Sequence, residues 1–131
     1  MQYFVTGATG FIGKRLVKTL LARKGVTVHF LLRQESARKV PELLEYWGAT
    51  KARAIPVFGD LTAKKLGVAA DELKALKGAG IDAGFHLAAV YDLKADEESQ
   101  IQANIEGTRN VVEFAKAVDA KHLHHVSSIA A

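Results

Sequence analysis

The sequence predicts an α/β fold built on an open, doubly wound parallel sheet with strands in the order 3-2-1-4-5. Short apolar runs alternate with segments of helical periodicity along all 131 residues. That alternation is typical of parallel strands joined by right-handed crossovers. A glycine-rich turn also separates the first apolar run from the first helical segment. We therefore expect ligands across the carboxyl ends of the strands, where the strand order reverses.

Five apolar runs are predicted as strands, at residues 2–6, 27–32, 53–58, 82–87 and 122–127. The first helix is predicted from about Gly10 to Lys24, and Gly25 is placed to end it. Its apolar residues recur at the spacing of one helix face and are expected to point inward: Ile12, Leu16, Leu20 and Leu21.

Three further segments have helical character. Ser36 is a candidate cap for the second helix, which carries Val40, Leu43, Leu44 and Trp47. Residues 61–80 are predicted to hold a turn and a short helix. The longest helix is predicted from about Ala95 to Val118. The residues that recur there at helical spacing are Ile101, Ile105, Thr108, Val111, Val112, Ala115 and Val118.

Composition narrows the function classes. With 49% hydrophobic residues in one stretch of domain length, the chain is predicted to be a single globular domain. It has no cysteine, which excludes disulfides and thiolate metal sites, and its apolar runs are too short to span a membrane. The net charge of +4 comes from scattered Lys and Arg, so we expect no nucleic-acid partner. Because the first strand starts so close to Met1, we expect no secretory signal and a cytoplasmic protein.

The glycine-rich turn is the strongest functional motif. Gly7, Gly10 and Gly13 stand between a strand and a helix, where free backbone N–H groups and the helix dipole hold a pyrophosphate. A P-loop is disfavoured, because five residues separate Gly7 from Gly13-Lys14 and Arg15 stands where a Mg²⁺-binding hydroxyl is required. The turn therefore indicates a dinucleotide site, although a tight structural turn would use the same glycines.

The end of the second predicted strand bears on the choice of dinucleotide. An acidic residue about 20 positions beyond the glycines selects NAD, but Arg33 occupies that place. A guanidinium suits the 2′-phosphate of NADP(H), with Arg38 or Lys39 as possible second contacts. The alternative interpretation is a solvated loop arginine.

Other polar or small residues follow the remaining strands. Asp60 has a carboxylate for the amino group of adenine, or it caps the following turn. Ala88 and Ala89 permit close approach of a ribose or nicotinamide, or simply fill the core. On the last strand, Ser127 and Ser128 place hydroxyls for a substrate carbonyl, or cap the next helix. His122 and His124 share a face of that strand, and without a carboxylate cluster we expect no metal there.

Four motifs in this order resemble the extended branch of the short-chain dehydrogenase/reductase superfamily, whose cofactor domain is a Rossmann fold. They are TGATGFIG at 6–13, GDL at 59–61, HLAAV at 86–90, and NIEGTRNVVEFA at 104–115 followed by HHVSS at 124–128. The segment 59–73 is similar to the fatty acyl-CoA reductase and thioester reductase subgroup. Hydroxysteroid dehydrogenases, dihydroflavonol-type reductases and nucleotide-sugar epimerases share most of the other motifs.

The resemblance implies a role for each matched residue. The pyrophosphate would lie against the glycine turn: Gly7, Thr9, Gly10, Phe11, Ile12 and Gly13. Arg33 would meet the 2′-phosphate, and Asp60 and Leu61 the adenine. The ribose–nicotinamide half would lie against Ala88, Ala89 and Tyr91. Asn104 would organise the catalytic lysine and its water, and Ser128 would polarise the reacting carbonyl. Ser127 is the second choice for that hydroxyl and is otherwise assigned to cofactor binding.

One element of the superfamily is missing. Its catalytic Tyr-x-x-x-Lys is absent, because Tyr91 and Lys94 are three apart and Tyr46 and Lys51 five apart. That tyrosine would protonate the developing alkoxide. We therefore expect residues 1–131 to be the amino-terminal, NAD(P)-binding part of a longer enzyme, inactive without its substrate lobe.

The expected intact protein is an NADP-dependent oxidoreductase. It would transfer hydride to an acyl thioester or derived aldehyde, carried by a small molecule or an acyl carrier. A ketone or alcohol dehydrogenase, a nucleotide-sugar epimerase and a non-catalytic NADP(H) sensor are the alternatives. An unpaired fifth strand also predicts a homo-oligomer.

Overall fold

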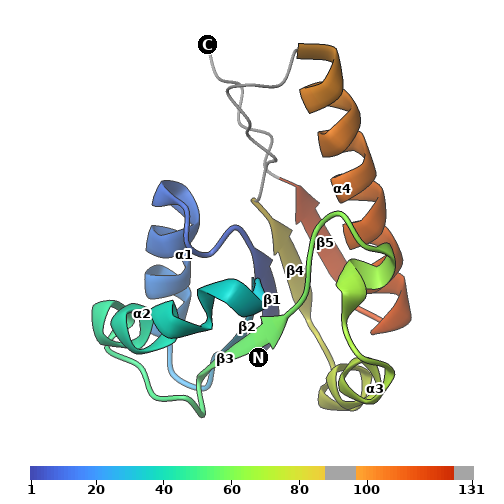
Figure 1. Ribbon diagram of the computed structural model, residues 1–131. Coiled ribbons are helices and arrows are strands. Elements are labelled where there is room, and N and C mark those ends of the chain that lie inside the picture. The colour runs from blue at the N-terminus through green and yellow to red at the C-terminus, as the bar shows by residue number, and fades with distance from the viewer. Residues whose placement is uncertain (88–96, 126–131) are drawn as a thin grey trace.

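The computed structural model describes residues 1–87 and 97–125, and in these it shows one five-stranded parallel sheet with helices on both faces (Figure 1). The strands are β1 (Gln2–Thr6), β2 (Thr27–Leu32), β3 (Ala54–Phe58), β4 (Ala83–His86) and β5 (His122–His125). They are ordered β3-β2-β1-β4-β5, and every neighbouring pair is parallel. The predicted strand order is confirmed.

The helices divide between the two faces (Figure 1). One face carries α1 (Phe11–Leu21), the 3₁₀ helix η1 (Gln34–Lys39) and α2 (Val40–Trp47). The other carries η2 (Lys64–Gly67), α3 (Ala70–Ala79) and α4 (Glu97–Ala117). None of the described helices is long and apolar enough to cross a membrane.

Each face of the sheet has its own apolar cluster, and successive residues of a strand contribute to opposite ones. Tyr3 and Val5 belong to the cluster under α1 and α2, whereas Phe4 belongs to the cluster under α3 and α4. Phe30 contacts Trp47 of α2 edge-on, with ring centroids 5.1 Å apart. On the other face Phe4 meets Phe114 of α4 at 4.4 Å. The sheet is therefore fixed from both sides.

The first helix begins where it was predicted but ends earlier, and one of its apolar residues does not face inward. It ends at Leu21 rather than at Lys24, and Gly25 lies in the following turn with φ +75°. Ile12 does not point inward but is 60% exposed, while Val17 is fully buried. The reason is geometric, because the first turn of α1 follows the carboxyl end of β1 and extends beyond the sheet.

The predicted cap at Ser36 is wrong. Ser36 lies inside η1, whose N-cap position is Arg33. Its backbone N–H donates to the Arg33 carbonyl at 2.9 Å, as part of the turn. The helix α2 begins later, at Val40, with proline in its first turn, where the missing N–H costs nothing. Of the apolar residues named for this helix, Val40, Leu43 and Trp47 are buried.

Candidate functional site

The turn between β1 and α1 is shaped by its three glycines. Gly7 has φ +77°, a conformation that favours glycine, and its carbonyl accepts the N–H of Gly10 at 3.1 Å. A Cβ on Gly13 would overlap the carbonyl oxygen of Gly7, so only glycine lets α1 pack this closely on the end of β1. The motif therefore serves packing at Gly13 and backbone conformation at Gly7.

The N-terminus of α1 is open to an anion. Its N-cap, Gly10, makes no side-chain cap, and its first turn has no acidic residue. Thr9, Gly10, Phe11 and Ile12 are all exposed. The first backbone N–H groups of a helix lack intrahelical partners and carry partial positive charge, which suits a phosphate. The turn thus fits the diphosphate that the sequence predicts.

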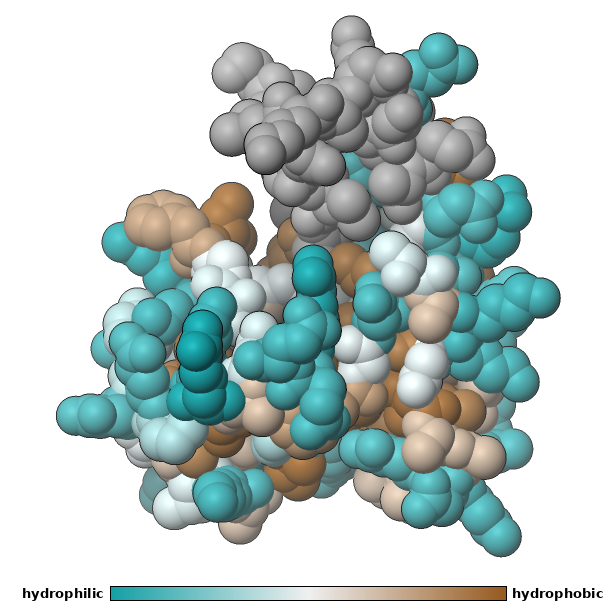
Figure 2. Space-filling model, viewed as in Figure 1, coloured by the Kyte–Doolittle hydropathy of each residue, from teal (hydrophilic) through white to brown (hydrophobic). Residues whose placement is uncertain are grey.

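Two large apolar side chains stand beside this cradle. Phe11 is 74% exposed and Ile12 is 60% exposed. Figure 2 shows apolar side chains projecting at the upper left, over α1. The guanidinium of Arg15 lies 4.3 Å from the centroid of the Phe11 ring, which adds a positive charge next to the helix terminus.

A shallow hollow of about 280 Å³ lies at the carboxyl ends of β2 and β3. It brings together Arg33 and Asp60, two residues that the sequence places 27 positions apart and assigns to the same half of the ligand. Its lining residues come from these two strand ends and the following loops: Arg33, Gln34, Glu35, Phe58, Gly59, Asp60 and Gly67. This hollow has the position expected for the adenosine half of a dinucleotide.

Asp60 performs the turn-capping role that was its alternative interpretation. Its Oδ1 accepts the backbone N–H of Thr62 at 2.9 Å and the Thr62 hydroxyl at 2.8 Å. These bonds, with a further contribution from the positive Arg33, hold the pKa of Asp60 below its usual range. Oδ2 makes no hydrogen bond to a described residue. The carboxylate is therefore ionised and oriented, and one of its oxygens has no hydrogen-bond donor among residues 1–87 and 97–125.

The loop after β3 is held in place by its own backbone. A Cβ on Gly59 would overlap the Leu66 carbonyl oxygen, and that oxygen accepts the N–H of Asp60 at 2.7 Å. Leu61 is not among the residues that line the hollow, and it packs against the cluster under α4. Its carbonyl accepts the side-chain Nδ2 of Asn110 at 2.7 Å. Asn110 was missed by the sequence reasoning, although it lies within the motif 104–115.

His86 ends β4 with an almost fully buried imidazole. Its Nδ1 lies 2.7 Å from the hydroxyl of Thr6, the last residue of β1, and its Nε2 lies 3.4 Å from the hydroxyl of Thr108 on α4. The ring also stacks on His125 of β5, with centroids 5.0 Å apart. Burial and the neighbouring His125 lower the pKa of His86 to about 4. His86 is therefore neutral at pH 7 and joins three strand ends to α4.

Several predicted site residues lie outside the described part of the chain, namely Ala88, Ala89, Tyr91, Ser127 and Ser128. Asn104 is described and lies on α4, half-buried, one turn before Thr108. His122 and His124 are exposed on β5. Within residues 1–87 and 97–125, no three His, Cys, Asp or Glu side chains form a group that could hold a metal ion.

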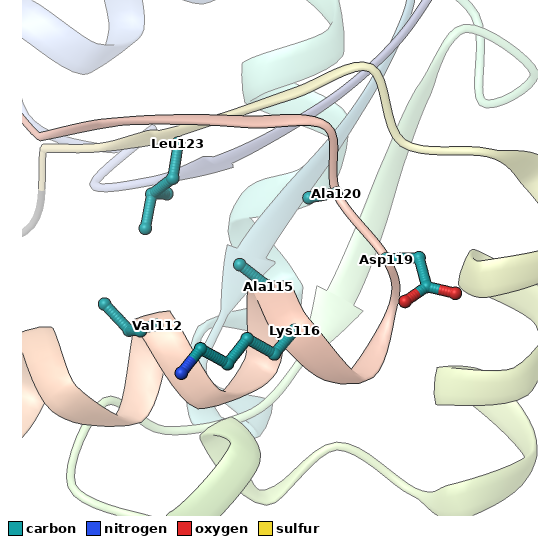
Figure 3. Close-up of a pocket in the computed structure, with 6 residues that line it drawn as sticks. All are labelled: Val112, Ala115, Lys116, Asp119, Ala120 and Leu123. Atoms are coloured by element: carbon teal, nitrogen blue, oxygen red, sulfur yellow. The ribbon is translucent and has the colours of Figure 1, made fainter.

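A larger hollow, of about 470 Å³, lies elsewhere (Figure 3). It is lined by Val112, Ala115 and Lys116 of α4, by the loop residues Asp119 and Ala120, and by Leu123 of β5. Because that loop leads into β5, this hollow opens near the amino ends of the strands. None of the predicted site residues lines it, so we place the functional site at the opposite edge.

Comparison with known families agrees with this geometry. A family model of an NAD-binding domain, described as "Male sterility protein", matches residues 5–131. The chain belongs to this family. It is therefore an NAD(P)-binding domain with the Rossmann-like topology of the extended short-chain dehydrogenases and reductases, as the four motifs predict.

Known proteins resemble this chain over nearly its whole length. It is 34% identical to part of a linear gramicidin synthase of Brevibacillus parabrevis, a match that covers 95% of the chain. It is 33% identical to a 4-hydroxy-2-methyl-3-oxo-4-farnesyl-3,4-dihydroquinoline-1-oxide ketoreductase of Stigmatella aurantiaca, over 98% of the chain. Among solved structures, the reductase (R) domain of a non-ribosomal peptide synthetase from Mycobacterium tuberculosis matches with a TM-score of 0.75 and 26% identity, over 98% of the chain.

The chain spans only a part of each of these relatives. It covers 3% of the gramicidin synthase polypeptide, 34% of the ketoreductase and 33% of the reductase domain. The comparisons therefore relate the chain to reductases and to a nicotinamide cofactor, and both agree with the open glycine turn at α1.

Proposed function

We infer that this domain binds NADP(H) for an oxidoreductase that transfers hydride to a carbonyl, namely an acyl thioester or the aldehyde derived from it. The observation that carries this proposal is the uncapped, exposed N-terminus of α1 at the same edge of the sheet as a hollow lined by Arg33 and Asp60. Similarity to the reductase domain of a peptide synthetase supports the thioester substrate class. The nicotinamide supplies the hydride when it is bound.

The proposal assigns roles to the candidate site residues that the structure describes. The amides around Gly10 hold the diphosphate, and Arg33 pairs with the 2′-phosphate. Oδ2 of Asp60 accepts a hydrogen bond from adenine. Thr9, Phe11 and Ile12 line the exposed side of the turn. This division explains why the turn has neither an acidic residue nor a side-chain cap.

The reacting end rests mostly on residues outside the described ranges, with Asn104 of α4 as the exception. Ala88, Ala89, Tyr91 and Ser127 would flank the ribose and nicotinamide, and Ser128 would donate a hydrogen bond to the carbonyl oxygen. Asn104 would help to position a lysine. Because residues 1–131 contain no Tyr-x-x-x-Lys, we expect this part alone to bind the dinucleotide without turnover.

The decisive experiment replaces Gly10 by alanine. In the present backbone the new Cβ would lie 3.4 Å from the Gly7 carbonyl oxygen, and φ at Gly10 is −74°, so Gly10→Ala should fold normally. The methyl group would stand at the entrance to the amide cradle. We expect affinity for NADPH, measured by calorimetric titration, to fall at least about tenfold, or 1.4 kcal/mol.

A matched control is available in Gly78→Ala. Gly78 lies inside α3, and a Cβ there meets no atom within 4 Å. The control should keep wild-type NADPH affinity. Equal affinity of Gly10→Ala and wild type would contradict the proposed diphosphate site.

A second candidate is a ketone reductase, which the similarity to the Stigmatella ketoreductase favours. A panel of acyl-CoAs and ketones, tested with the full-length protein and NADPH, separates the two. Thioester consumption supports the first candidate. Ketone turnover without thioester turnover would replace it with the second.

A further inference from the structure

The helix α4 makes polar contacts with two strand ends on the ligand side of the sheet. Asn110 is only 6% exposed, and its Nδ2 donates to the Leu61 carbonyl at 2.7 Å. Leu61 directly follows Asp60, which lines the hollow at the end of β3. The Asn110 amide therefore anchors the segment that carries the Asp60 carboxylate.

Thr108, two residues earlier, contacts the neighbouring strand end. Its hydroxyl lies 3.4 Å from Nε2 of His86, the last residue of β4, and His86 in turn meets Thr6 at the end of β1. Thr6 leads directly into Gly7 and the diphosphate turn. The side chains of Thr108 and Asn110 thus connect α4 to two different places at the edge of the sheet where the strands have their carboxyl ends.

The two contacts are separable. The Asn110 bond ends on the loop after β3, whereas the Thr108 contact ends on the β1–β4 pair, so the two contacts have no residue in common. Arg109 between them is exposed and pairs with Glu106 on the same helix, at 3.3 Å. The helix therefore presents two independent anchors on its buried side.

We propose that Asn110 and Thr108 are positioning residues, of which Asn110 sets the adenosine subsite and Thr108, through His86, sets the nicotinamide side. Neither side chain touches the ligand itself. This inference rests on the proposed function, because it assigns the two anchors to the two halves of NADP(H). Loss of a neutral hydrogen bond of this kind changes affinity by about two- to tenfold.

The test compares NADPH with adenosine 2′,5′-bisphosphate, which probes the adenosine subsite alone. Asn110→Leu removes the donor at similar size, and we expect both affinities to fall about fivefold. Thr108→Val removes the hydroxyl at constant shape, and we expect it to weaken NADPH about threefold and to leave the bisphosphate unchanged. If Asn110→Leu does not fold, Asn110→Asp, which cannot donate at neutral pH, carries the same expectation.

Arg109→Gln is the control, and it should leave both affinities unchanged. The inference requires that Thr108→Val weakens NADPH but not the bisphosphate, whereas Asn110→Leu weakens both. A merely structural role would make Thr108→Val weaken both ligands as well, or would leave both ligands unaffected in both variants, and either result would overturn the inference. If the wild-type protein bound NADPH but the two variants showed the same pattern of affinities for the two ligands, the inference alone would fail. If the wild type bound neither ligand, the proposed function would fail together with it.

Discussion

His86 shows at the level of one residue how the ligand edge of the sheet depends on a neutral side chain. Its imidazole is 3% exposed, lies 2.7 Å from the Thr6 hydroxyl and stacks on His125. Protonation would place a charge in this buried position beside a second histidine. Burial and His125 accordingly lower its pKa to about 4, from 6.5.

This shift predicts a loss of stability in mild acid. Above about pH 7 His86 is neutral in both the folded and the unfolded protein. As the pH falls from 6.5 towards 4, His86 gains a proton in the unfolded protein but not in the folded protein. The free energy of unfolding should fall by about 2–4 kcal/mol across that window and level off below it. Urea unfolding at pH 7.5 and pH 4.5 measures the difference.

The variant His86→Gln should reduce this pH dependence. Part of the pH dependence should remain in this variant, because burial also lowers the pKa of His29. Identical unfolding free energies of the wild type at the two pH values would contradict the expectation.

Arg33 carries the prediction on coenzyme choice. Arg33→Asp removes the cation at the end of β2 and adds a charge that repels a 2′-phosphate. We expect NADPH binding to weaken by about 1.5–3 kcal/mol, the range for hydrogen bonds to charged groups, while NADH affinity is retained. Arg23→Asp makes the same charge change near the amino edge, at an exposed position, and should alter neither affinity. Unchanged NADPH affinity in Arg33→Asp would refute the assignment.

Some features of the candidate site could be predicted from the sequence and others could not, for physical reasons. Arg33 and Asp60 follow strands, and parallel strands bring their carboxyl ends to one edge, so their proximity was predictable. Asn110 was not predictable, because a buried amide that bonds a loop carbonyl has the same periodicity as any helix residue. The left-handed φ of Leu66, +60°, likewise depends on tertiary contacts.

At the scale of elements, α1 and α2 are joined by the side chains of two adjacent residues. The indole Nε1 of Trp47 donates to the Lys14 carbonyl at 2.9 Å, and the ammonium groups of Lys14 and Lys18 lie 4.3 and 4.8 Å from the centroid of the Tyr46 ring. Trp47 also packs on Phe30 of β2. These contacts hold the helix that presents the glycine turn.

Trp47→Phe should therefore destabilise the domain. It keeps an aromatic ring but removes the donor to the Lys14 carbonyl and some buried volume, which together cost about 1–3 kcal/mol. Urea unfolding measures the change. Tyr46→Phe is the matched control, because it keeps the ring under both lysines, and it should stay within about 0.5 kcal/mol of the wild type. A cost for Tyr46→Phe as large as that for Trp47→Phe would contradict the assigned contact.

Helix existence was easier to predict than helix ends. The apolar spacing identified α1, α2 and α4, because their inward faces pack on a sheet. The spacing did not show that Ile12 lies beyond the sheet edge, where an apolar residue has nothing to cover it. The sequence also predicted a capping role for Ser36, whereas a 3₁₀ helix of six residues starts before this residue. Local propensity does not resolve at which residue the first hydrogen-bonded turn of a helix begins.

At the scale of the whole molecule, β5 raises the question of association. Within the described residues it pairs only with β4, so its other edge has backbone groups without a strand partner. We expect the 131-residue chain to form dimers or larger species in sedimentation velocity runs, increasingly with concentration. A single monomeric species at the highest soluble concentration would contradict this prediction.

The order of the strands was predictable at this scale because it follows from topology. Alternating strands and helices allow few right-handed arrangements, and the glycine turn fixes which strand is central. The hollows were not predictable, since their shape depends on how loops close over strand ends. The larger one lies near the amino ends of the strands, where no motif pointed.

The position of Met1 has a practical consequence. Its ammonium group donates to the Gly25 carbonyl at 2.7 Å at the amino edge of the sheet, and the five residues of β1 separate it from the glycine turn. That strand spans roughly 15 Å. A fluorophore or a solid support attached at the amino terminus would therefore leave the proposed coenzyme entrance facing the solution.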